Sequence, residues 1–192
     1  MANYKIAILV GSLRKDSINR KIAKSICAMR DDNLDCSMVE IGDLPLYNQD
    51  FDKLSEQPEQ YVRFRDQIRQ ADGVLFVTPE YNRSVPGVLK NAIDVGSRPY
   101  GQSVFDGKPG AVVSVTPGGL GAFGANHHLR QSLVFLNVPT LQSEAYISGA
   151  GALFDDQGRL VNEDTRGFLT KYASDFARWV ELVAAARTPE LV

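Results

Sequence analysis

Short apolar runs alternate with helix-like patterns from one end of this chain to the other. The apolar runs predict five strands, at residues 5–10, 36–41, 73–78, 111–116 and 140–147. The third and fourth runs are continuously apolar, which is typical of strands buried on both faces of a parallel sheet. The pattern therefore favours a parallel sheet whose connections cross over its faces.

Helical patterns occupy the connections between these strands. They predict one helix directly after Ser17 and four more, over residues 56–71, from Pro86, over 122–136 and over 163–186. Ser17 and Ser84 are N-cap candidates, because a serine hydroxyl accepts a hydrogen bond from an unpaired N–H of the first turn. In the last helix, apolar residues at spacings of three and four predict a buried stripe, formed by Phe168, Tyr172, Phe176, Trp179 and Val183.

Five strand–helix units joined by short loops predict an α/β fold, in which a doubly wound five-stranded parallel sheet lies between helices in three layers. At 192 residues the chain is expected to form one domain, residues 1–192, with a full hydrophobic core. For strand order 2-1-3-4-5 the winding reverses between the first and third strands. Ligands bind outside the carboxyl ends of the strands at that point, so the loops after these two strands are expected to carry the chemistry.

Composition and charge narrow the classes of function. Apolar residues make up 44% and charged residues 23%, and the net charge is −2, with Lys and Arg scattered along the chain. We therefore expect no nucleic-acid partner. We also expect no membrane span, because no apolar run approaches about 20 residues. Two cysteines without a CxxC pair, and a start that lacks a secretion signal, favour a cytoplasmic protein.

The loop after the first strand has the composition of a phosphate site. It reads GSLRKDSIN over residues 11–19 and leads directly into a predicted helix. Loop N–H groups and a helix N-terminus attract phosphate, and the Arg14 guanidinium has a geometry suited to phosphate oxygens. Ser17 is also explained as an N-cap, and the two roles are compatible. The segment predicts that the protein holds a phosphorylated small molecule.

The loop after the third strand is stiff. It reads TPEYNRSVPG over residues 78–87. Pro79 and Pro86 fix the backbone at its two ends, so the N–H groups between them have defined directions. A flat heterocycle such as a flavin needs directed donors and acceptors along one edge, and Tyr81 is placed to cover a ring face. The alternative is a rigid strand-to-helix turn with a capping serine, and the spacing leaves both open.

Together the two loops resemble a known family. GSLR with Ser17 and Asn19, followed by TPEYN, SVPG and LKNAID up to residue 94, resembles the NAD(P)H-dependent FMN reductases, and most closely their bacterial chromate and quinone reductase branch. The resemblance covers residues 4–147. It implies a flavodoxin-like fold, non-covalently bound FMN, and NADPH or NADH as co-substrate. It also implies a homodimer or homotetramer in which a neighbouring subunit often completes the flavin pocket.

The resemblance further implies the cofactor-binding residues. The first loop is expected at the FMN phosphate and the second along the isoalloxazine ring. In a third loop the family often reads Ser-Pro-Gly and then Gly-Gly, where this chain has Thr116-Pro117-Gly118 and later Ala122 in place of a glycine. The predicted residues are Ser12, Arg14, Ser17, Ile18, Asn19, Pro79, Glu80, Tyr81, Asn82, Thr116 and Gly118.

Other motifs carry weaker signals. Residues 119–124 match GxGxxG but follow the fourth strand rather than the first, so we interpret them as a glycine loop at the edge of the pocket. Residues 101–108 resemble a P-loop but have the wrong spacing, and Pro109 stands where a serine or threonine is needed. His127 and His128 point about 100° apart on a helix, which argues against a shared metal and favours a surface or subunit contact.

No nucleophile and base stand out as a pair, since GxSxG is absent and neither histidine has an obvious serine or cysteine partner in the sequence. We therefore expect no catalytic side chain, with FMN carrying the chemistry. The predicted enzyme passes a hydride from NAD(P)H to FMN and then reduces a small-molecule acceptor, such as a quinone, an azo or nitro compound, or chromate. The alternatives are a flavodoxin-type electron carrier, which the loop arginine and weak net charge disfavour, and a non-catalytic FMN-binding module.

Overall fold

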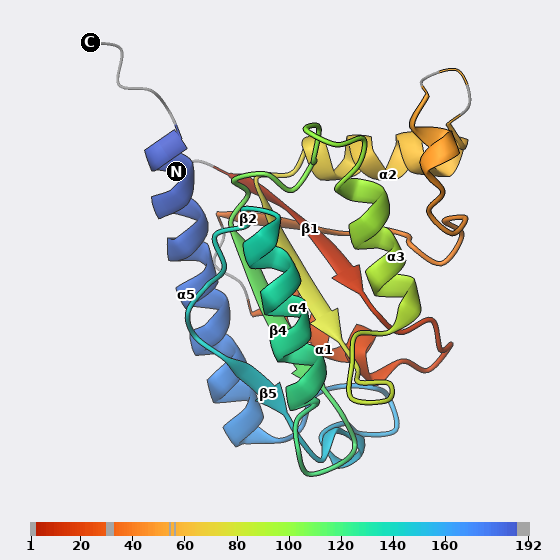
Figure 1. The fold of residues 1–192 in the computed structure, drawn as a ribbon. Helices are drawn as coiled ribbons and strands as arrows, with labels where there is room; N and C mark the ends of the chain where they lie inside the picture. The colour runs from red at the N-terminus through yellow and green to blue at the C-terminus, as the bar shows by residue number, and fades with distance from the viewer. Residues whose placement is uncertain (1–2, 30–32, 54, 56, 188–192) are drawn as a thin grey trace.

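The computed structural model describes residues 3–29, 33–53, 55 and 57–187, and a five-stranded parallel sheet lies at its centre (Figure 1). The strands lie in the order β2-β1-β3-β4-β5, which confirms the predicted doubly wound topology. Their bounds are β1 Tyr4–Val10, β2 Leu34–Met38, β3 Gly73–Thr78, β4 Gly110–Val115 and β5 Ala145–Ile147.

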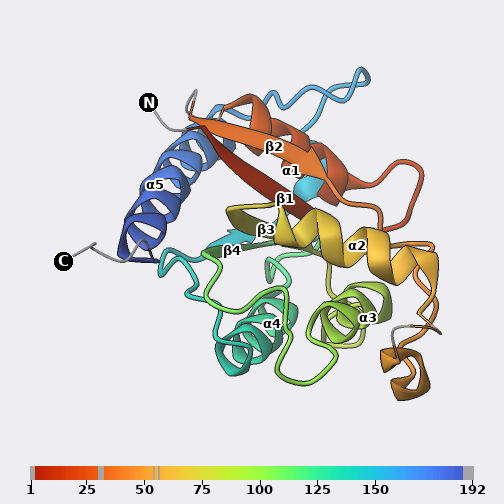
Figure 2. The ribbon, with the colours of Figure 1, turned by 90° about the horizontal axis from the view of Figure 1, so that it is seen from above.

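Helices cover both faces of the sheet, so the fold has three layers (Figure 2). Alternate residues of β1 point to opposite faces: Ile6 and Ile8 enter the core beneath one pair of helices, and Ala7 and Leu9 enter the core beneath the other three. The pair is α1 (Ile18–Ala28) and α5 (Glu163–Arg187), and the other three are α2 (Glu59–Arg69), α3 (Gly87–Gly96) and α4 (Phe123–Phe135). Two short 3-10 turns, η1 (Gln49–Asp52) and η3 (Ala150–Ala152), lie in the connections.

The two central strands β3 and β4 are buried along their whole length, as their continuous apolar sequences predict. The edge strand β2 differs from its prediction, because the sequence predicts a strand over 36–41 and the structure has it at Leu34–Met38. Val39 and Ile41, which suggested a longer strand, are buried in the core beneath α2 and α3 as part of a loop.

The prediction for the last strand is wrong in length, since β5 holds only Ala145–Ile147 of the predicted residues 140–147. Thr140 makes one isolated bridge to Gly110. Beyond it, the carbonyl oxygens of Leu141 and Ser143 accept hydrogen bonds from the Arg130 guanidinium, each at 3.0 Å. These carbonyls face a side chain of α4 rather than β4, so the sheet pairing cannot start until residue 145.

The prediction for the buried stripe of α5 is also partly wrong. Tyr172 and Phe176 are buried as predicted, but Phe168 is 42% exposed and its neighbour Leu169 is buried instead. The Phe168 ring stacks on the edge of the core against Tyr172. Among the described residues, no helix has both the length and the apolar character needed to span a membrane.

Two helix starts differ in how they are capped. Ser17 caps α1, because its hydroxyl accepts a hydrogen bond from the Arg20 N–H at 3.2 Å, which confirms the prediction. The prediction that Ser84 caps α3 is wrong: Pro86 holds the cap position, and the Ser84 hydroxyl bonds to His128 instead. The helix predicted over 56–71 lies at Glu59–Arg69, and Glu56 itself lies outside the described residues.

Candidate active site

A cavity of about 270 Å³ lies at the carboxyl ends of β1, β3 and β4, where the three following loops meet. This is the edge of the sheet where the winding reverses, which is where open α/β sheets bind ligands. Figure 1 shows these loops at the arrowhead ends of the strands. The lining residues are Ser12, Arg14, Ile18, Asn19, Pro79, Glu80, Tyr81, Val115, Thr116 and Pro117.

Eight of the eleven predicted cofactor-binding residues line this cavity, namely Ser12, Arg14, Ile18, Asn19, Pro79, Glu80, Tyr81 and Thr116. The other three, Ser17, Asn82 and Gly118, belong to the same loops but do not line it. Sequence reasoning missed Val115 and Pro117. The position of Val115 at the end of a central strand was the available signal, because strand ends at this edge face the ligand.

The loop after β1 presents polar groups to the cavity. The Asn19 side chain is 6% exposed, and its Oδ1 has no hydrogen-bond partner within the described part of the chain. A buried polar atom without a partner costs about 1–3 kcal/mol, so it marks a place where a ligand group fits. Ser12 is buried beside it and Arg14 is exposed at the rim. Gly11 allows the loop to pass close to α3, since a Cβ there would lie 3.2 Å from both Leu89 and Pro79.

The loop after β3 contains a tight hairpin. Tyr81 and Ser84 exchange two backbone hydrogen bonds of 3.1 and 3.0 Å, and Asn82 and Arg83 between them have φ values of 51° and 64°. Two successive positive φ values are the signature of a type I′ turn. The turn places Tyr81 at the mouth of the cavity, 52% exposed, and sends Asn82 outward, which explains why Asn82 does not line it.

The loop after β4 is held by its own backbone and by β5. The Thr116 hydroxyl accepts a hydrogen bond from the Gly118 N–H at 3.2 Å, and the Gly118 carbonyl accepts one from Gly149 at 3.1 Å. Two glycines of the GxGxxG segment have packing reasons. A Cβ on Gly121 would lie 2.6 Å from the Tyr146 Cβ, and a Cβ on Gly124 would lie 2.8 Å from the Arg83 carbonyl oxygen.

Glu80 divides its carboxylate between α4 and its own loop. Its Oε2 accepts a hydrogen bond from the Ala125 N–H in the first turn of α4 at 3.1 Å, and its Oε1 lies 3.6 Å from the Arg83 guanidinium. The side chain therefore joins the loop after β3 to the helix after β4.

The two histidines have separate partners on the surface of α4. His127 Nε2 lies 2.9 Å from the Tyr146 hydroxyl, and His128 Nδ1 lies 3.0 Å from the Ser84 hydroxyl. No serine partner for either histidine is obvious in the sequence; the structure gives His128 one, Ser84, which escapes sequence reasoning because it lies 44 residues away. Among the described residues, no cluster of three or more potential metal ligands occurs.

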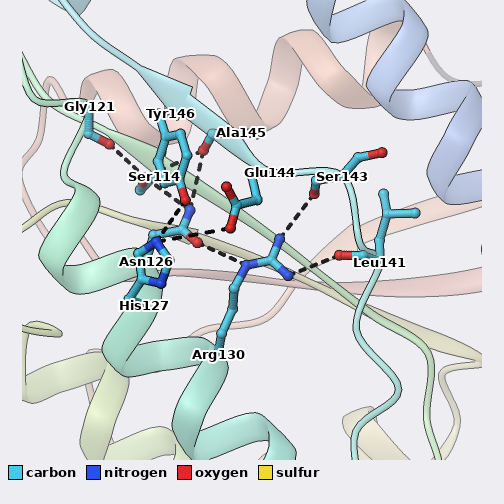
Figure 3. A network of polar contacts seen from close by, with 10 residues as sticks. All are labelled: Ser114, Gly121, Asn126, His127, Arg130, Leu141, Ser143, Glu144, Ala145 and Tyr146. Carbon is cyan, nitrogen blue, oxygen red and sulfur yellow. Dashed lines mark hydrogen bonds and ion pairs between the residues drawn. The ribbon is translucent and has the colours of Figure 1, made fainter.

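Behind His127, a network of buried polar groups fixes α4 to the sheet (Figure 3). Asn126 donates to the Ser114 hydroxyl at 3.0 Å and accepts from the Arg130 Nε at 3.0 Å, and Ser114 donates to the Gly121 carbonyl at 2.6 Å. At its edge, burial and then the hydrogen bond with Glu144 raise the pKa of Tyr146 to about 12. Through the Gly121 carbonyl, this network also ties the glycine loop to the end of β4.

A larger hollow of about 620 Å³ lies between α3 and α4. It contains the Ser84–His128 pair and the exposed ion pair predicted for Lys90 and Asp94, which is confirmed with Nζ–O distances of 2.7 and 2.8 Å. It lies on the helical flank rather than at the strand ends. The smaller cavity is the better candidate active site, because it combines the switch point of the sheet with an unpartnered buried amide.

Several known proteins resemble this chain over most of its length. The chain is 60% identical over 180 residues to a quinone reductase of Pseudomonas putida, covering 93% of this chain and 96% of that one. It is 46% identical over 177 residues to a 2-hydroxy-1,4-benzoquinone reductase of a Burkholderia species, covering 92% and 96%. Among solved structures, FerB, a flavoenzyme NAD(P)H:(acceptor) oxidoreductase of Paracoccus denitrificans, superposes with a TM-score of 0.87 at 40% identity, covering 93% and 98%.

The family described as NADPH-dependent FMN reductase matches residues 4–152, which include all five strands and all three loops of the cavity. The chain therefore belongs to the NADPH-dependent FMN reductase family.

Proposed function

We propose that the cavity binds FMN without a covalent bond and that the chain is an NAD(P)H-dependent quinone reductase. The observation that carries the placement of the cofactor is Asn19, which lines the cavity at the switch point and whose buried Oδ1 has no partner in the described residues. The family and the relatives named quinone reductase support the activity.

The loop after β1 fits the phosphate end of the cofactor. The N-terminus of α1 carries about half a positive charge, and its first turn begins at Ile18, next to the cavity. Arg14 adds a guanidinium that pairs well with phosphate oxygens. An asparagine amide offers a donor and an acceptor, so Asn19 suits both a phosphate oxygen and a neighbouring hydroxyl of the ribityl chain. Ser12, Arg14, Ser17, Ile18 and Asn19 are the residues that we assign to this end.

The loops after β3 and β4 fit the ring. Pro79 and Tyr81 form one wall, and Thr116 and Pro117 form the other. The cavity volume of about 270 Å³ is close to the lower end of the roughly 300–1,000 Å³ typical of ligand pockets. A cofactor of the size of FMN would thus be enclosed on one side only, which leaves a ring face open to a second ligand. Asn82 and Gly118 do not line the cavity themselves. We assign them to the ring-binding loops because their backbone shapes the two segments that do line it.

FMN, when bound, supplies the hydride chemistry between NAD(P)H and the acceptor, and no side chain of the chain is assigned to it. The protein contributes orientation and electrostatics. Pro79 and the Tyr81–Ser84 hairpin hold the backbone of this loop in place, so that its N–H groups other than those of Tyr81 and Ser84, which the hairpin uses, would stabilise negative charge on a bound ring. We propose a quinone as the acceptor, and chromate, azo and nitro compounds as candidates for the same open face.

The test has two readings on the purified protein. Its visible spectrum and the release of FMN on heating report the cofactor, and steady-state oxidation of NADH and NADPH with benzoquinone reports the activity. We expect a flavin spectrum and turnover with benzoquinone. A flavin spectrum without turnover would instead identify an electron carrier or a non-catalytic flavin-binding module, and protein without flavin affinity would contradict the proposal.

The assembly and location form a second part of the proposal. Val134 and Phe135 on α4 are 70% and 82% exposed; Phe135 lines the hollow between α3 and α4, and Val134 lines a second hollow beside α5. Adjacent exposed apolar side chains support a homodimer or homotetramer that covers this face. Light scattering of the wild type and of Phe135→Asp tests it, with a smaller particle expected for the variant. The low cysteine content supports a cytoplasmic location, which fractionation of cells that make the protein checks.

A further inference from the structure

We infer that Glu80 is a positioning residue, whose carboxylate ties the loop after β3 to the start of α4 and so sets the separation of the two cavity walls that hold the flavin ring. This inference rests on the proposed function, because it assigns the ring to this cavity. It differs from the role that the family resemblance implies, in which Glu80 simply lines the ring.

The first observation is that α4 lacks a cap of its own. Ala122 holds the cap position with a φ of 57°, and its side chain offers no hydrogen-bond acceptor. The first N–H groups of a helix have no partner inside it, and Ser, Thr, Asp or Asn usually supplies one from the cap position. At the start of α4, the acceptor for the Ala125 N–H comes from Glu80, 45 residues earlier in the chain.

The second observation is that the surroundings of the carboxylate are shaped for this contact. The Glu80 side chain is 14% exposed, and both of its oxygens face partners, the Ala125 N–H at 3.1 Å and the Arg83 guanidinium at 3.6 Å. A Cβ on Gly124 would lie 3.0 Å from Oε2 and 2.8 Å from the Arg83 carbonyl oxygen. Glycine at 124 therefore leaves the space through which the carboxylate reaches the helix.

The third observation is the position of this link relative to the cavity. Glu80 lines the cavity together with its neighbours Pro79 and Tyr81, and Thr116 and Pro117, on the connection that leads into α4, line it as well. A cap supplied from the residue just before the helix would leave the two lining loops independent, and the left-handed φ of 57° at Ala122 does not suit such a cap. A carboxylate reaching across makes the first turn of α4 and the position of the loop after β3 depend on each other.

The charge of Glu80 is also balanced at this point. The N-terminal end of α4 carries about half a positive charge, and Arg83 lies on the other side of the carboxylate. A negative charge placed at a cavity that accepts electrons would otherwise oppose their arrival. The carboxylate thus keeps its hydrogen-bond acceptors, while the helix N-terminus and Arg83 offset its negative charge.

The test compares FMN dissociation constants and amide exchange in four single variants. Glu80→Ala removes the hydrogen-bond acceptor, and Glu80→Gln keeps an acceptor oxygen at the end of a side chain of the same length. Gly124→Ala places a Cβ in the path of the carboxylate to α4. Arg83→Ala is the matched control that removes only the ion pair. We expect FMN binding to weaken about 3- to 30-fold in Glu80→Ala, the range that follows from loss of a helix N-cap. We expect near-wild-type affinity in Glu80→Gln and in Arg83→Ala.

Gly124→Ala separates positioning from simple stabilisation. Alanine is a better helix former than glycine, so helix stability alone would leave FMN affinity unchanged or tighter, but the new Cβ would also lie 2.8 Å from the Arg83 carbonyl oxygen and press on the loop directly. The double variant Glu80→Ala/Gly124→Ala separates the two effects: if the carboxylate is what is displaced, the double variant binds FMN no more weakly than Glu80→Ala alone, and a further loss assigns the effect to the backbone clash. Displacement of the carboxylate predicts weaker FMN binding together with faster amide exchange over residues 118–126 in the protein without FMN. If Glu80→Ala does not fold, Gly124→Ala and Glu80→Gln still decide the matter.

The inference is overturned if Glu80→Ala and Gly124→Ala both bind FMN as tightly as the wild type, or if Glu80→Gln binds as weakly as Glu80→Ala. Neither result touches the proposed function, which fails only if the wild-type protein itself does not bind FMN or does not oxidise NAD(P)H.

Discussion

Two asparagines near the starts of helices, Asn19 in α1 and Asn126 in α4, are almost equally buried, at 6% and 0% exposure, and yet differ in their partners. Asn126 uses both ends of its amide, toward Ser114 and Ala145 on one side and Arg130 on the other. Asn19 leaves its Oδ1 without a partner in the described residues. Other buried atoms without a hydrogen-bond partner, such as Asp52 Oδ1 and Arg65 Nη1, lie away from the cavity, so it is the position of Asn19 in the cavity lining that makes its unpaired oxygen point to a ligand.

This comparison distinguishes two regions: one whose polar groups stabilise the packing of α4 on the sheet, and one whose polar groups are arranged to bind a ligand. The network around Asn126 joins α4, β4 and β5 (Figure 3). The region around Asn19 is a loop and a helix N-terminus with Arg14 exposed beside them. Changes in the first region should alter the free energy of unfolding, and changes in the second should alter ligand affinity alone.

The largest expected effect is on the fold region. Asn126→Leu should lower the free energy of unfolding by about 2–6 kcal/mol, because Ser114 and Arg130 each lose a partner at about 1–3 kcal/mol. Urea denaturation of the protein without FMN measures it. Ser132→Ala, which removes a hydroxyl bonded only to its own helix, is the control and should change little. A variant as stable as the wild type would show that the network is dispensable.

Next in size is the effect of Arg14→Ala on the ligand region. FMN binding should weaken by about 1.5–3 kcal/mol, the range for a hydrogen bond to a charged group, while the free energy of unfolding without FMN stays the same. Arg69→Ala on α2 is the matched control. It removes an exposed guanidinium that pairs with Asp66 in the same helix and that does not line the cavity. Unchanged FMN affinity in Arg14→Ala would place the phosphate elsewhere.

Asn19→Leu should separate the two regions with a smaller effect. We expect FMN affinity to fall by about 1–2 kcal/mol, while the stability of the FMN-free protein is unchanged or rises, because leucine removes an amide buried without full pairing. Titration with FMN and urea denaturation of the same preparation give both quantities. A loss of stability like that of Asn126→Leu would erase the distinction drawn between the two asparagines.

The smallest expected effect is a change in titration at the edge of the network. Burial and Glu144 raise the pKa of Tyr146 to about 12 from 10.0, so its hydroxyl stabilises the fold fully below pH 10 and this contribution is lost as the pH rises toward 12. The difference between wild type and Tyr146→Phe, followed by tyrosinate absorbance, should therefore titrate near 12. A difference curve centred at the ordinary tyrosine value would show that the hydroxyl is not held by the network.

The sequence was sufficient for the parts of the fold that depend on local pattern. The buried strands β3 and β4 are apolar throughout, and the loop after β1 has a strand before it and a capped helix after it, so both were predicted close to their observed bounds. The length of β5 was not predictable from local pattern, because the carbonyl oxygens of Leu141 and Ser143 accept hydrogen bonds from Arg130, which lies on another element, α4.

Contacts between distant parts of the sequence also explain what was missed at the candidate site. The residues that line the cavity from the loops after β1 and β3 follow from motifs read along the chain. The contact of Glu80 with Ala125 and that of Ser84 with His128 join residues more than forty positions apart, and no periodicity or local motif reports such pairs. Asn82 belongs to the TPEYN motif, but the hairpin that turns it outward needs a positive φ at Arg83, which arginine rarely adopts. The motif alone therefore did not predict its orientation.

The most direct test of the central claim compares FMN with riboflavin, which lacks only the phosphate, in fluorescence titrations of the FMN-free protein. If the loop after β1 holds the phosphate, the wild type should bind FMN at least about 10-fold more tightly than riboflavin, and Arg14→Ala should narrow that gap without weakening riboflavin. Equal affinity for the two flavins in the wild-type protein would contradict the account.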